Sequence, residues 1–269
     1  TRGREKYRPL SAIQEEARQL AESGFLEIQL LGQNVNSYRD PESGAGLAEL
    51  LKKISEINQI QWIRFLTSHP RNFSFEMALA MASSPKVCHQ LHLPVQSGSN
   101  QVLARMNRNY SREDYLEKIS WLKSLMPDIS LSTDIIVGFP GETDDDFQQT
   151  LELVDQVQYT NIFSFRYSPR PLTRAASFKD DVPAEVKIER LIELQKRQKE
   201  IQLKVNGEML GQKQKVLALG QSKKGNLYTG RNEAYQVVNF SSRRELTPGF
   251  VEVKIVGGGA YSLKGEAVC

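Results

Sequence analysis

Residues 129–146 have the sequence ISLSTDIIVGFPGETDDD, and no other segment says more about the architecture of this chain. An apolar run rich in β-branched residues ends in a Gly-Phe-Pro-Gly loop at 138–141, and three aspartates follow at 144–146. The pattern predicts a buried parallel strand, a loop, and a helix whose first turn is capped by Thr143. Because ligands bind beyond the carboxyl ends of such strands, the loop is a candidate ligand site; a plain strand-to-helix turn fits this segment equally well.

Strand-like and helix-like segments alternate from the start of the chain to residue 206. Such alternation predicts an α/β fold with parallel strands and right-handed helical crossovers. Strands are expected at 25–31, 62–67, 90–95, 129–137 and 162–167, and helices at 11–23, 47–57, 75–82, 111–125, 144–157 and 183–205.

Residues 207–269 have a different pattern, with short β-rich segments separated by turns. This part holds nine Lys or Arg against five Glu, whereas residues 1–206 are nearly neutral. Strands are expected at 216–219, 227–230, 236–240, 250–255 and 260–263, with the Gly-Gly-Gly run at 257–259 joining the last two. Five such strands predict a small antiparallel barrel, a shape often used to bind oligonucleotides. We therefore expect two domains, 1–206 and 207–269. The basic excess fits a polyanionic partner, although a solvated face would explain so modest an excess as well.

Composition bounds the remaining possibilities. No apolar run approaches the length of a membrane span, so we expect no membrane partner. Cys88 and Cys269 are the only cysteines, which excludes a disulfide framework and favours a reducing compartment, the cytoplasm. The chain begins at Thr1 rather than at methionine, and we expect an upstream part to be missing.

Several motifs at the predicted strand ends resemble the methylthiotransferase branch of the radical S-adenosylmethionine enzymes, in order along nearly the whole chain. They are TRGRE (1–5), LGQNVNSY (31–38), TSHP (67–70), HLPVQSGS (92–99), RMNR (105–108), STDIIVGFPGET (132–143) and YSPRP (167–171). The tripeptides NSY (36–38) and VNF (238–240) resemble those of the tRNA-modifying subfamily rather than those of the subfamily that modifies a ribosomal protein.

The resemblance implies a partial (β/α) barrel whose first strand is missing, followed by a TRAM domain, an RNA-binding β-barrel. It implies an enzyme that adds a methylthio group to N6-isopentenyl-modified adenosine next to the anticodon. The implied cofactors are S-adenosylmethionine and two [4Fe–4S] clusters, and the implied partners are a tRNA anticodon stem-loop and an electron donor such as flavodoxin.

The family's three-cysteine cluster loop and N-terminal domain would lie before Thr1, so we expect this chain by itself to hold neither cluster and to be inactive. Two alternatives stay open. One is methylthiolation of a ribosomal-protein aspartate, and the other is a non-catalytic scaffold that binds tRNA and S-adenosylmethionine.

The resemblance also implies which residues face S-adenosylmethionine. Glycine allows close backbone approach, amides can bind the methionine amino group or ribose hydroxyls, and a guanidinium can bind a carboxylate at two points. The expected residues are Gly32, Gln33, Asn34, Thr67, Gln96, Arg108, Asp134 and Gly138. Turn capping would equally explain Gln33 and Asn34, and a surface ion pair would explain Arg108.

For RNA, cations that contact phosphates and rings that stack on bases are expected in the barrel. The candidates are Lys223, Lys224, Arg231, Arg243 and Arg244, interleaved with Tyr228, Tyr235 and Phe240. Aromatic side chains can instead fill the barrel core, and we favour that for Phe240. We expect no acid–base catalyst and no metal ligand: His69 and His92 have no ligand spacing, and Cys88 is expected to be an inert buried thiol.

Overall fold

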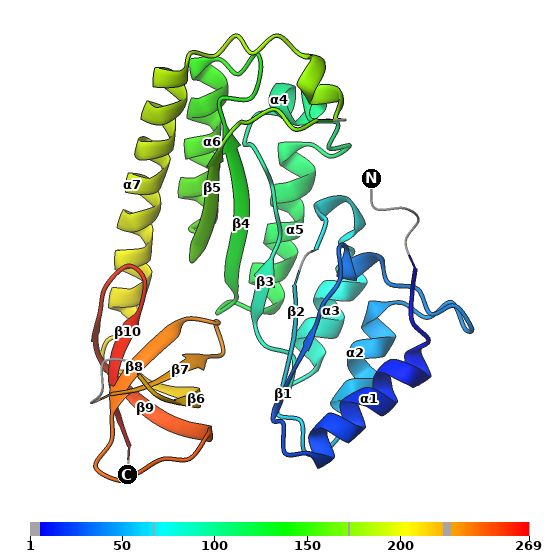
Figure 1. Cartoon of the computed structure of the whole chain (residues 1–269), viewed down its shortest axis with the longest axis vertical. Coiled ribbons are helices and arrows are strands. Elements are labelled where there is room, and N and C mark those ends of the chain that lie inside the picture. The colour runs from blue at the N-terminus through cyan, green and yellow to red at the C-terminus, as the bar shows by residue number, and fades with distance from the viewer. Residues whose placement is uncertain (1–5, 67, 172, 223–226, 269) are drawn as a thin grey trace. The chain divides into compact units, whose positions relative to one another are not determined.

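The computed structural model describes residues 6–66, 68–171, 173–222 and 227–268, which form two compact units. The first unit contains Thr1–Pro94 and Glu113–Ile129, and the second contains Val95–Arg112 and Ser130–Cys269. Figure 1 labels the elements of both. These units do not coincide with the predicted domains 1–206 and 207–269, and that division stays a prediction.

The first unit is built of helices packed on two parallel strands. Ile28 pairs with Ile63 in the centre of that parallel pair, and both side chains are buried. The elements are α1 (Leu10–Glu22), β1 (Glu27–Leu30), α2 (Leu47–Ser55), β2 (Trp62–Phe65), α3 (Phe75–Ser83), β3 (Gln90–His92), α5 (Arg112–Leu125) and two short 3-10 helices, η1 (Val35–Ser37) and η2 (Pro70–Asn72). Apolar spacing along α2 buries Leu50 and Ile54, as that spacing predicts.

The α/β part of the second unit contains the stretch 129–146. It consists of α4 (Asn100–Arg105), β4 (Ser130–Val137), α6 (Asp144–Val157), β5 (Asn161–Arg166), the 3-10 helix η3 (Arg174–Ser177) and α7 (Ala184–Glu208). β4 and β5 pair in parallel, as predicted. Thr143 caps α6 in a reciprocal capping box with Asp146, which confirms the predicted cap.

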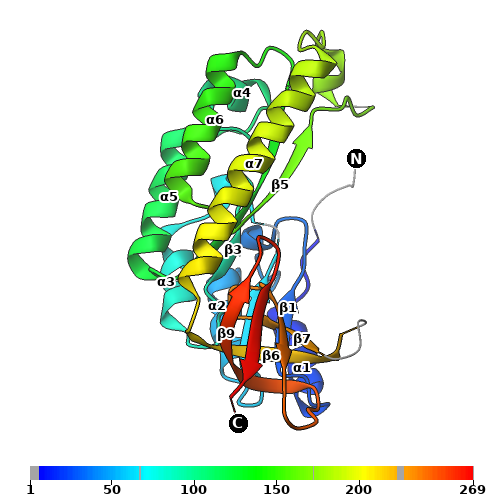
Figure 2. The same cartoon turned by 90° about the vertical axis from the view of Figure 1, so that its left-hand side faces the viewer.

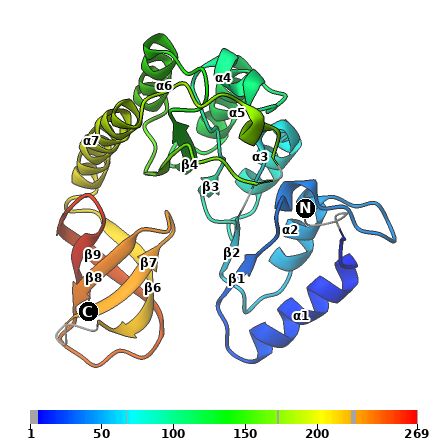
Figure 3. The same cartoon turned by 45° about the horizontal axis from the view of Figure 1, so that its top comes forward.

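The rest of the second unit is a closed five-stranded barrel, which confirms the predicted architecture (Figure 3). Its strands are β6 (Lys213–Gln221), β7 (Tyr228–Asn232), β8 (Val237–Ser241), β9 (Gly249–Gly258) and β10 (Leu263–Ala267), in the order β10-β8-β7-β6-β9. The pairs β6–β7, β7–β8, β6–β9 and β9–β10 are antiparallel, whereas β8 and β10 pair in parallel. Val238, Phe240 and Leu263 are fully buried in the core.

Two details of the barrel and one helix differ from the sequence-based expectation. The glycine run does not form the turn: Gly257 and Gly258 pair with β10, so the turn lies at 259–262 and the strand expected at 260–263 starts only at Leu263. Tyr228 is buried and stacks on Phe240, so it is a core residue and not an RNA-facing one. Helix α4 was not expected, because six residues give too little periodicity to detect.

The last turns of α7 lie against the barrel (Figure 2), and the start of β4 is hydrogen-bonded to it. The Ser130 hydroxyl donates to the Ala234 carbonyl at 3.1 Å, and the Asn206 amide donates to the Gly259 carbonyl at 2.7 Å. Gln236 donates in turn to Asn206 at 2.7 Å. The barrel is therefore fixed at the end of β4 opposite to Gly138. Within the described ranges, no helix has the length and apolarity needed to cross a bilayer.

Candidate functional site

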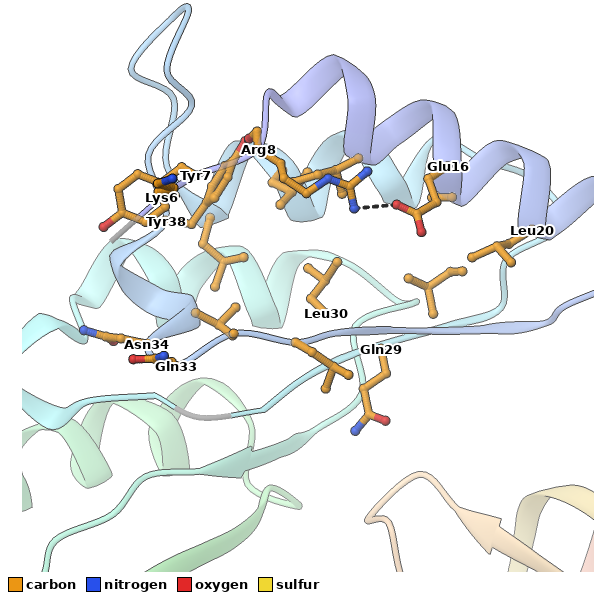
Figure 4. Close-up of a pocket in the computed structure, with 18 residues that line it drawn as sticks. Lys6, Tyr7, Arg8, Glu16, Leu20, Gln29, Leu30, Gln33, Asn34 and Tyr38 are labelled. Carbon is orange, nitrogen blue, oxygen red and sulfur yellow. Dashed lines mark hydrogen bonds and ion pairs between the residues drawn. The ribbon is translucent and has the colours of Figure 1, made fainter. Parts of the chain in front are cut away.

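A cavity of about 520 Å³ lies in the first unit, between β1, α1 and α2 (Figure 4). Three of the predicted cofactor-binding residues, Gly32, Gln33 and Asn34, line it where the chain leaves β1. Apolar side chains such as Leu20 and Leu50 form much of the remaining wall. The cavity thus combines apolar walls with several polar side chains, a composition found in small-molecule sites.

Asn34 carries an unsatisfied polar atom in this cavity. Its amide nitrogen donates to the Ser37 hydroxyl at 2.6 Å, but its Oδ1 is buried and has no hydrogen-bond partner within the described residues. Leaving a buried acceptor unpaired costs about 1–3 kcal/mol, so a ligand that donates a hydrogen bond is expected here. The ammonium group of an amino acid is such a donor, and Asn34 therefore fits the methionine end of S-adenosylmethionine.

Asn36 holds the tips of the two strands of the first unit together. Its side chain donates to the His69 carbonyl at 2.9 Å and accepts from the His69 amide at 2.9 Å. The His69 ring itself accepts from the Arg71 amide at 3.2 Å and so caps the short helix η2. Thr67, also predicted to face the cofactor, lies outside the described residues.

In the second unit, Gln96 and Asp134 lie side by side. The backbone N–H of Gln96 donates to the backbone carbonyl of Asp134 at 2.9 Å. The backbone carbonyl of Gln96 accepts from the backbone N–H of Ile136 at 3.0 Å. Gln96 has a φ of 74°, which is rare for a residue other than glycine, and its side chain is buried. Such strained positions are often found at ligand sites. Asp134 is half-buried on β4.

Gly138 begins the loop that follows β4, and the backbone conformation at this position requires glycine. Its φ is +70°, and an added Cβ would lie 2.3 Å from Cγ of Lys187. Its amide donates to Glu142, whose carboxylate also accepts from Arg190 of α7 at 2.8 Å. Phe139 in the same loop packs edge-on against Tyr167, with ring centroids 5.0 Å apart. The loop is therefore fixed from both sides before any ligand binds.

Burial raises the pKa of the Glu142 carboxyl above its usual range. The Gly138 amide and the Arg190 guanidinium act in the opposite direction but do not cancel the cost of desolvation.

Arg108 follows α4 and is half-buried. It makes no ion pair with any described residue, so the surface ion-pair alternative finds no support in this part of the chain. Its neighbour Tyr110 donates to the Val95 carbonyl at 3.0 Å, next to Gln96. Burial raises the pKa of Tyr110 to about 12, and the charge of Arg108 acts against that rise. Gln96, Arg108, Asp134 and Gly138 thus belong to one unit, while Gly32, Gln33 and Asn34 belong to the other.

The outer face of the barrel carries two cation–ring pairs. The Arg231 guanidinium lies 4.2 Å from the centre of the Tyr235 ring, and the Lys215 ammonium lies 4.2 Å from that of Phe250. Leu217 pairs with Arg231 on one side and with Phe250 on the other, so all of these residues share one face. We call Lys215, Leu217, Arg231, Tyr235 and Phe250 the barrel row.

Lys215 and Phe250 were not among the predicted RNA-binding residues. The signal that could have found them is the alternation of β6 and β9, which places them outside. Arg243 and Arg244 are exposed in the segment after β8. Lys223 and Lys224 lie outside the described residues.

The described residues do not form a site for an iron–sulfur cluster. Among them, no group of three or more His, Cys, Asp or Glu side chains could hold a metal ion. Cys88 is 2% exposed, as expected for a structural thiol. A [4Fe–4S] cluster needs several thiolate ligands, so the described part of the chain does not fit that group.

Comparison with known proteins gives three findings. The model of the Radical SAM superfamily matches residues 1–154. Curated relatives called tRNA-2-methylthio-N(6)-dimethylallyladenosine synthase are 47% identical over 99% of this chain in Solibacter usitatus and 45% identical over 99% in Clostridium botulinum. The chain spans 61% and 60% of the length of these relatives. Among solved structures, coproporphyrinogen III oxidase from Escherichia coli, a radical SAM enzyme, is similar in fold, with a TM-score of 0.54 and 17% identity over 83% of this chain and 59% of that one.

Proposed function

Since this chain belongs to the radical SAM superfamily, we propose that it forms the part of a tRNA methylthiotransferase that binds the cofactor and the RNA. The observation that carries the proposal is the 45–47% identity, over 99% of the chain, to enzymes called tRNA-2-methylthio-N(6)-dimethylallyladenosine synthase. The reaction that we infer adds a methylthio group to an adenosine that already carries an N6-isopentenyl group.

Membership of the superfamily implies S-adenosylmethionine as the cofactor. Bound in an intact enzyme, it would supply the radical that activates the substrate and the methyl group that is transferred. Asn34 would accept a hydrogen bond from its ammonium group, because Oδ1 is buried and unsatisfied. Arg108 would bind its carboxylate, and Gln96 or Asp134 would accept from its ribose hydroxyls. The loop from Gly138 would lie along the adenine, and its backbone is already held in place by Glu142.

These residues would bind and orient S-adenosylmethionine. None of them transfers a proton in the reaction that we infer. A rigid loop is suited to this task, because an ordered site loses less entropy when the cofactor binds. If the methionine end of S-adenosylmethionine enters the cavity next to Asn34, the apolar wall there would exclude water from it.

The barrel would bind the RNA at a distance from the reacting base. Ser130, which contacts the barrel, and Gly138 lie at opposite ends of β4, about 26 Å apart for an extended strand. Arg231, Arg243 and Arg244 supply cations on the barrel, and Tyr235 supplies a ring. A tRNA stem-loop is long enough to contact both places, so we propose that the barrel holds the RNA while its loop reaches the cofactor.

The two alternatives receive less support. The relatives are named for tRNA and not for a ribosomal protein, which disfavours the aspartate-modifying reaction. A scaffold without catalysis would describe this chain by itself, since its described residues form no cluster site. The anticodon stem-loop as the bound element, an electron donor such as flavodoxin and the cytoplasmic location stay predictions.

The test of the proposed function is the content of modified nucleosides in tRNA. In a strain from which the gene is deleted, mass spectrometry should show loss of 2-methylthio-N6-isopentenyladenosine and accumulation of N6-isopentenyladenosine. The intact gene should restore the methylthio nucleoside, and the same gene with Asn34→Ala should restore less of it. Unchanged methylthio nucleoside in the deletion strain would refute the proposal.

A further inference from the structure

Two phenylalanines of β5 are exposed although they lie within a strand of the α/β core. Phe163 is 50% exposed and Phe165 is 52% exposed, whereas the neighbouring Ile162 is buried. Burying a phenylalanine stabilises a protein by roughly 1.5–3 kcal/mol relative to leaving it exposed. Because they alternate along β5, both exposed rings are on one face of the strand, and exposed apolar surface of this kind often marks a binding site.

The strand register places this patch beside a proposed cofactor residue. Phe163 pairs with Asp134 and Phe165 pairs with Ile136, and β4 and β5 lie side by side in Figure 1. Paired residues of parallel strands point to the same face of the sheet, so the two rings share a face with Asp134 and Ile136. The other face of β5 turns to α7, where Gln195 donates to the Ser164 hydroxyl at 3.3 Å. The patch is thus on the face opposite to α7.

We propose that Phe163 and Phe165 bind the target base, an adenine carrying a hydrocarbon tail, on this face next to the cofactor. The inference rests on the proposed function and names the substrate subsite within it. Residues two apart on one strand face are separated by about 7 Å, and stacked carbon atoms approach to about 3.5–4 Å. One planar base therefore fits between the two rings. Ile136, which pairs with Phe165, would contact the hydrocarbon tail of the base.

The chemistry of the patch favours this occupant over an unmodified base. Rings stack on any base, but an apolar side chain beside them gains from covering a hydrocarbon group as well. Asp134, which lies two residues before Ile136 on the same face of β4, adds a polar group at the edge of the patch. This face of the sheet therefore presents three apolar side chains, Phe163, Phe165 and Ile136, and one carboxylate, Asp134.

The experiment measures binding of two hairpin RNAs to the full chain by fluorescence anisotropy. One hairpin carries N6-isopentenyladenosine in its loop, and the other carries plain adenosine at the same position. The unaltered chain should bind the modified hairpin more tightly. Phe163→Ala and Phe165→Ala should each weaken binding of the modified hairpin between about fivefold and about 150-fold, the range for loss of one ring stacked on a base.

Two further sets of variants make the result specific. Phe163→Tyr and Phe165→Tyr keep the ring and should retain most of the affinity, while Phe163→Leu keeps apolar bulk without the ring and should lose it. Phe25→Ala is the matched control, because Phe25 is 56% exposed and lies in the other unit, outside the proposed site. Phe25→Ala should leave the affinity for the modified hairpin and the affinity for the unmodified hairpin unchanged.

The outcomes separate this inference from the function on which it rests. If the unaltered chain binds the hairpins and the Phe163 and Phe165 variants bind them equally well, the base subsite is wrong while RNA binding stands. If those variants change only the sedimentation of the chain, the patch is a protein contact and the inference is overturned. If the unaltered chain binds neither hairpin, the proposed RNA-binding function fails and this inference fails with it.

Discussion

Arg190 of α7 donates to the carboxylate of Glu142 at 2.8 Å, and both side chains are almost completely buried, with 7% and 1% of their surface exposed. The same carboxylate accepts the amide of Gly138, so an ion pair from a distant helix sets the shape of the proposed cofactor loop. Removing one partner of a buried pair leaves a charge in a medium of low dielectric. We therefore expect Arg190→Met to lower the free energy of unfolding by about 3–5 kcal/mol, measured by urea denaturation.

An exposed pair in the same chain provides the control. Arg8 and Glu16 are 2.6 Å apart, but 61% and 53% of their side chains are exposed. Arg8→Met should change the free energy of unfolding by no more than about 1 kcal/mol. The double variant Glu142→Gln, Arg190→Met should be more stable than Arg190→Met alone, because the unpaired charge is gone. Equal effects of Arg8→Met and Arg190→Met would contradict the role of the buried pair.

The capping residue Asp146 gives a prediction for pH. Burial raises the pKa of its carboxyl, but hydrogen bonds from Ser99 and Thr143 outweigh burial and leave the pKa below its ordinary value of 3.8. A carboxyl whose pKa is lower in the folded state stabilises the fold above its unfolded pKa, and this contribution is lost as the pH falls through the folded pKa. Between pH 6 and about pH 3, the wild type should therefore lose more stability than Asp146→Asn. The free energy of unfolding of each protein would be measured by urea denaturation across this pH range. If it falls equally for both proteins, Asp146 is not the group responsible.

Gly138 and Gly24 allow strain and crowding to be separated. Both have positive φ, +70° and +90°, but an added Cβ at Gly138 would meet Lys187 at 2.3 Å, whereas at Gly24 nothing lies within 4 Å. Alanine in this region of backbone conformation costs roughly 1–2 kcal/mol by itself. We expect Gly24→Ala to cost about that amount and Gly138→Ala to cost clearly more, measured by thermal or urea denaturation. Similar costs at both positions would show that Lys187 moves aside easily.

Local sequence patterns were sufficient for most of the α/β elements. The alternation of buried and half-buried residues on β4 and the cap at Thr143 are both local signals, and both are present in the structure. Motif resemblance predicted the cofactor residues at the strand ends, and two of these residues, Gln33 and Asn34, line a cavity. The short helix α4 and the position of the last turn were missed, because each depends on a few residues whose preference is decided by their neighbours in space.

Contacts between distant segments could not be predicted. Arg190 is 48 residues from Glu142, and nothing in the charged sequence of α7 distinguishes it from the exposed Arg197 on the same helix. The exposure of Phe163 and Phe165 could not be predicted either, because the sequence NIFSFR does not show whether anything covers the face of β5 that carries the two rings. Tyr228 was assigned to the RNA because a ring followed by an arginine two or three residues on does not reveal which way the ring points.

Phe250 of the barrel row and the exposed Arg243 and Arg244 after β8 give a prediction in which stacking and charge are measured separately. Arg243→Gln and Arg244→Gln remove exposed cations, so each should weaken hairpin binding and reduce the slope of log affinity against log salt concentration by about 1 for every phosphate that is no longer neutralised. Phe250→Ala removes a ring and should weaken binding without changing that slope, since stacking releases no counterions. Lys264→Gln, an exposed cation on β10 away from the row, is the control and should have little effect. If Lys264→Gln weakens binding as much as Arg243→Gln does, the attraction comes from the net charge of the barrel and not from Arg243 and Arg244 in particular.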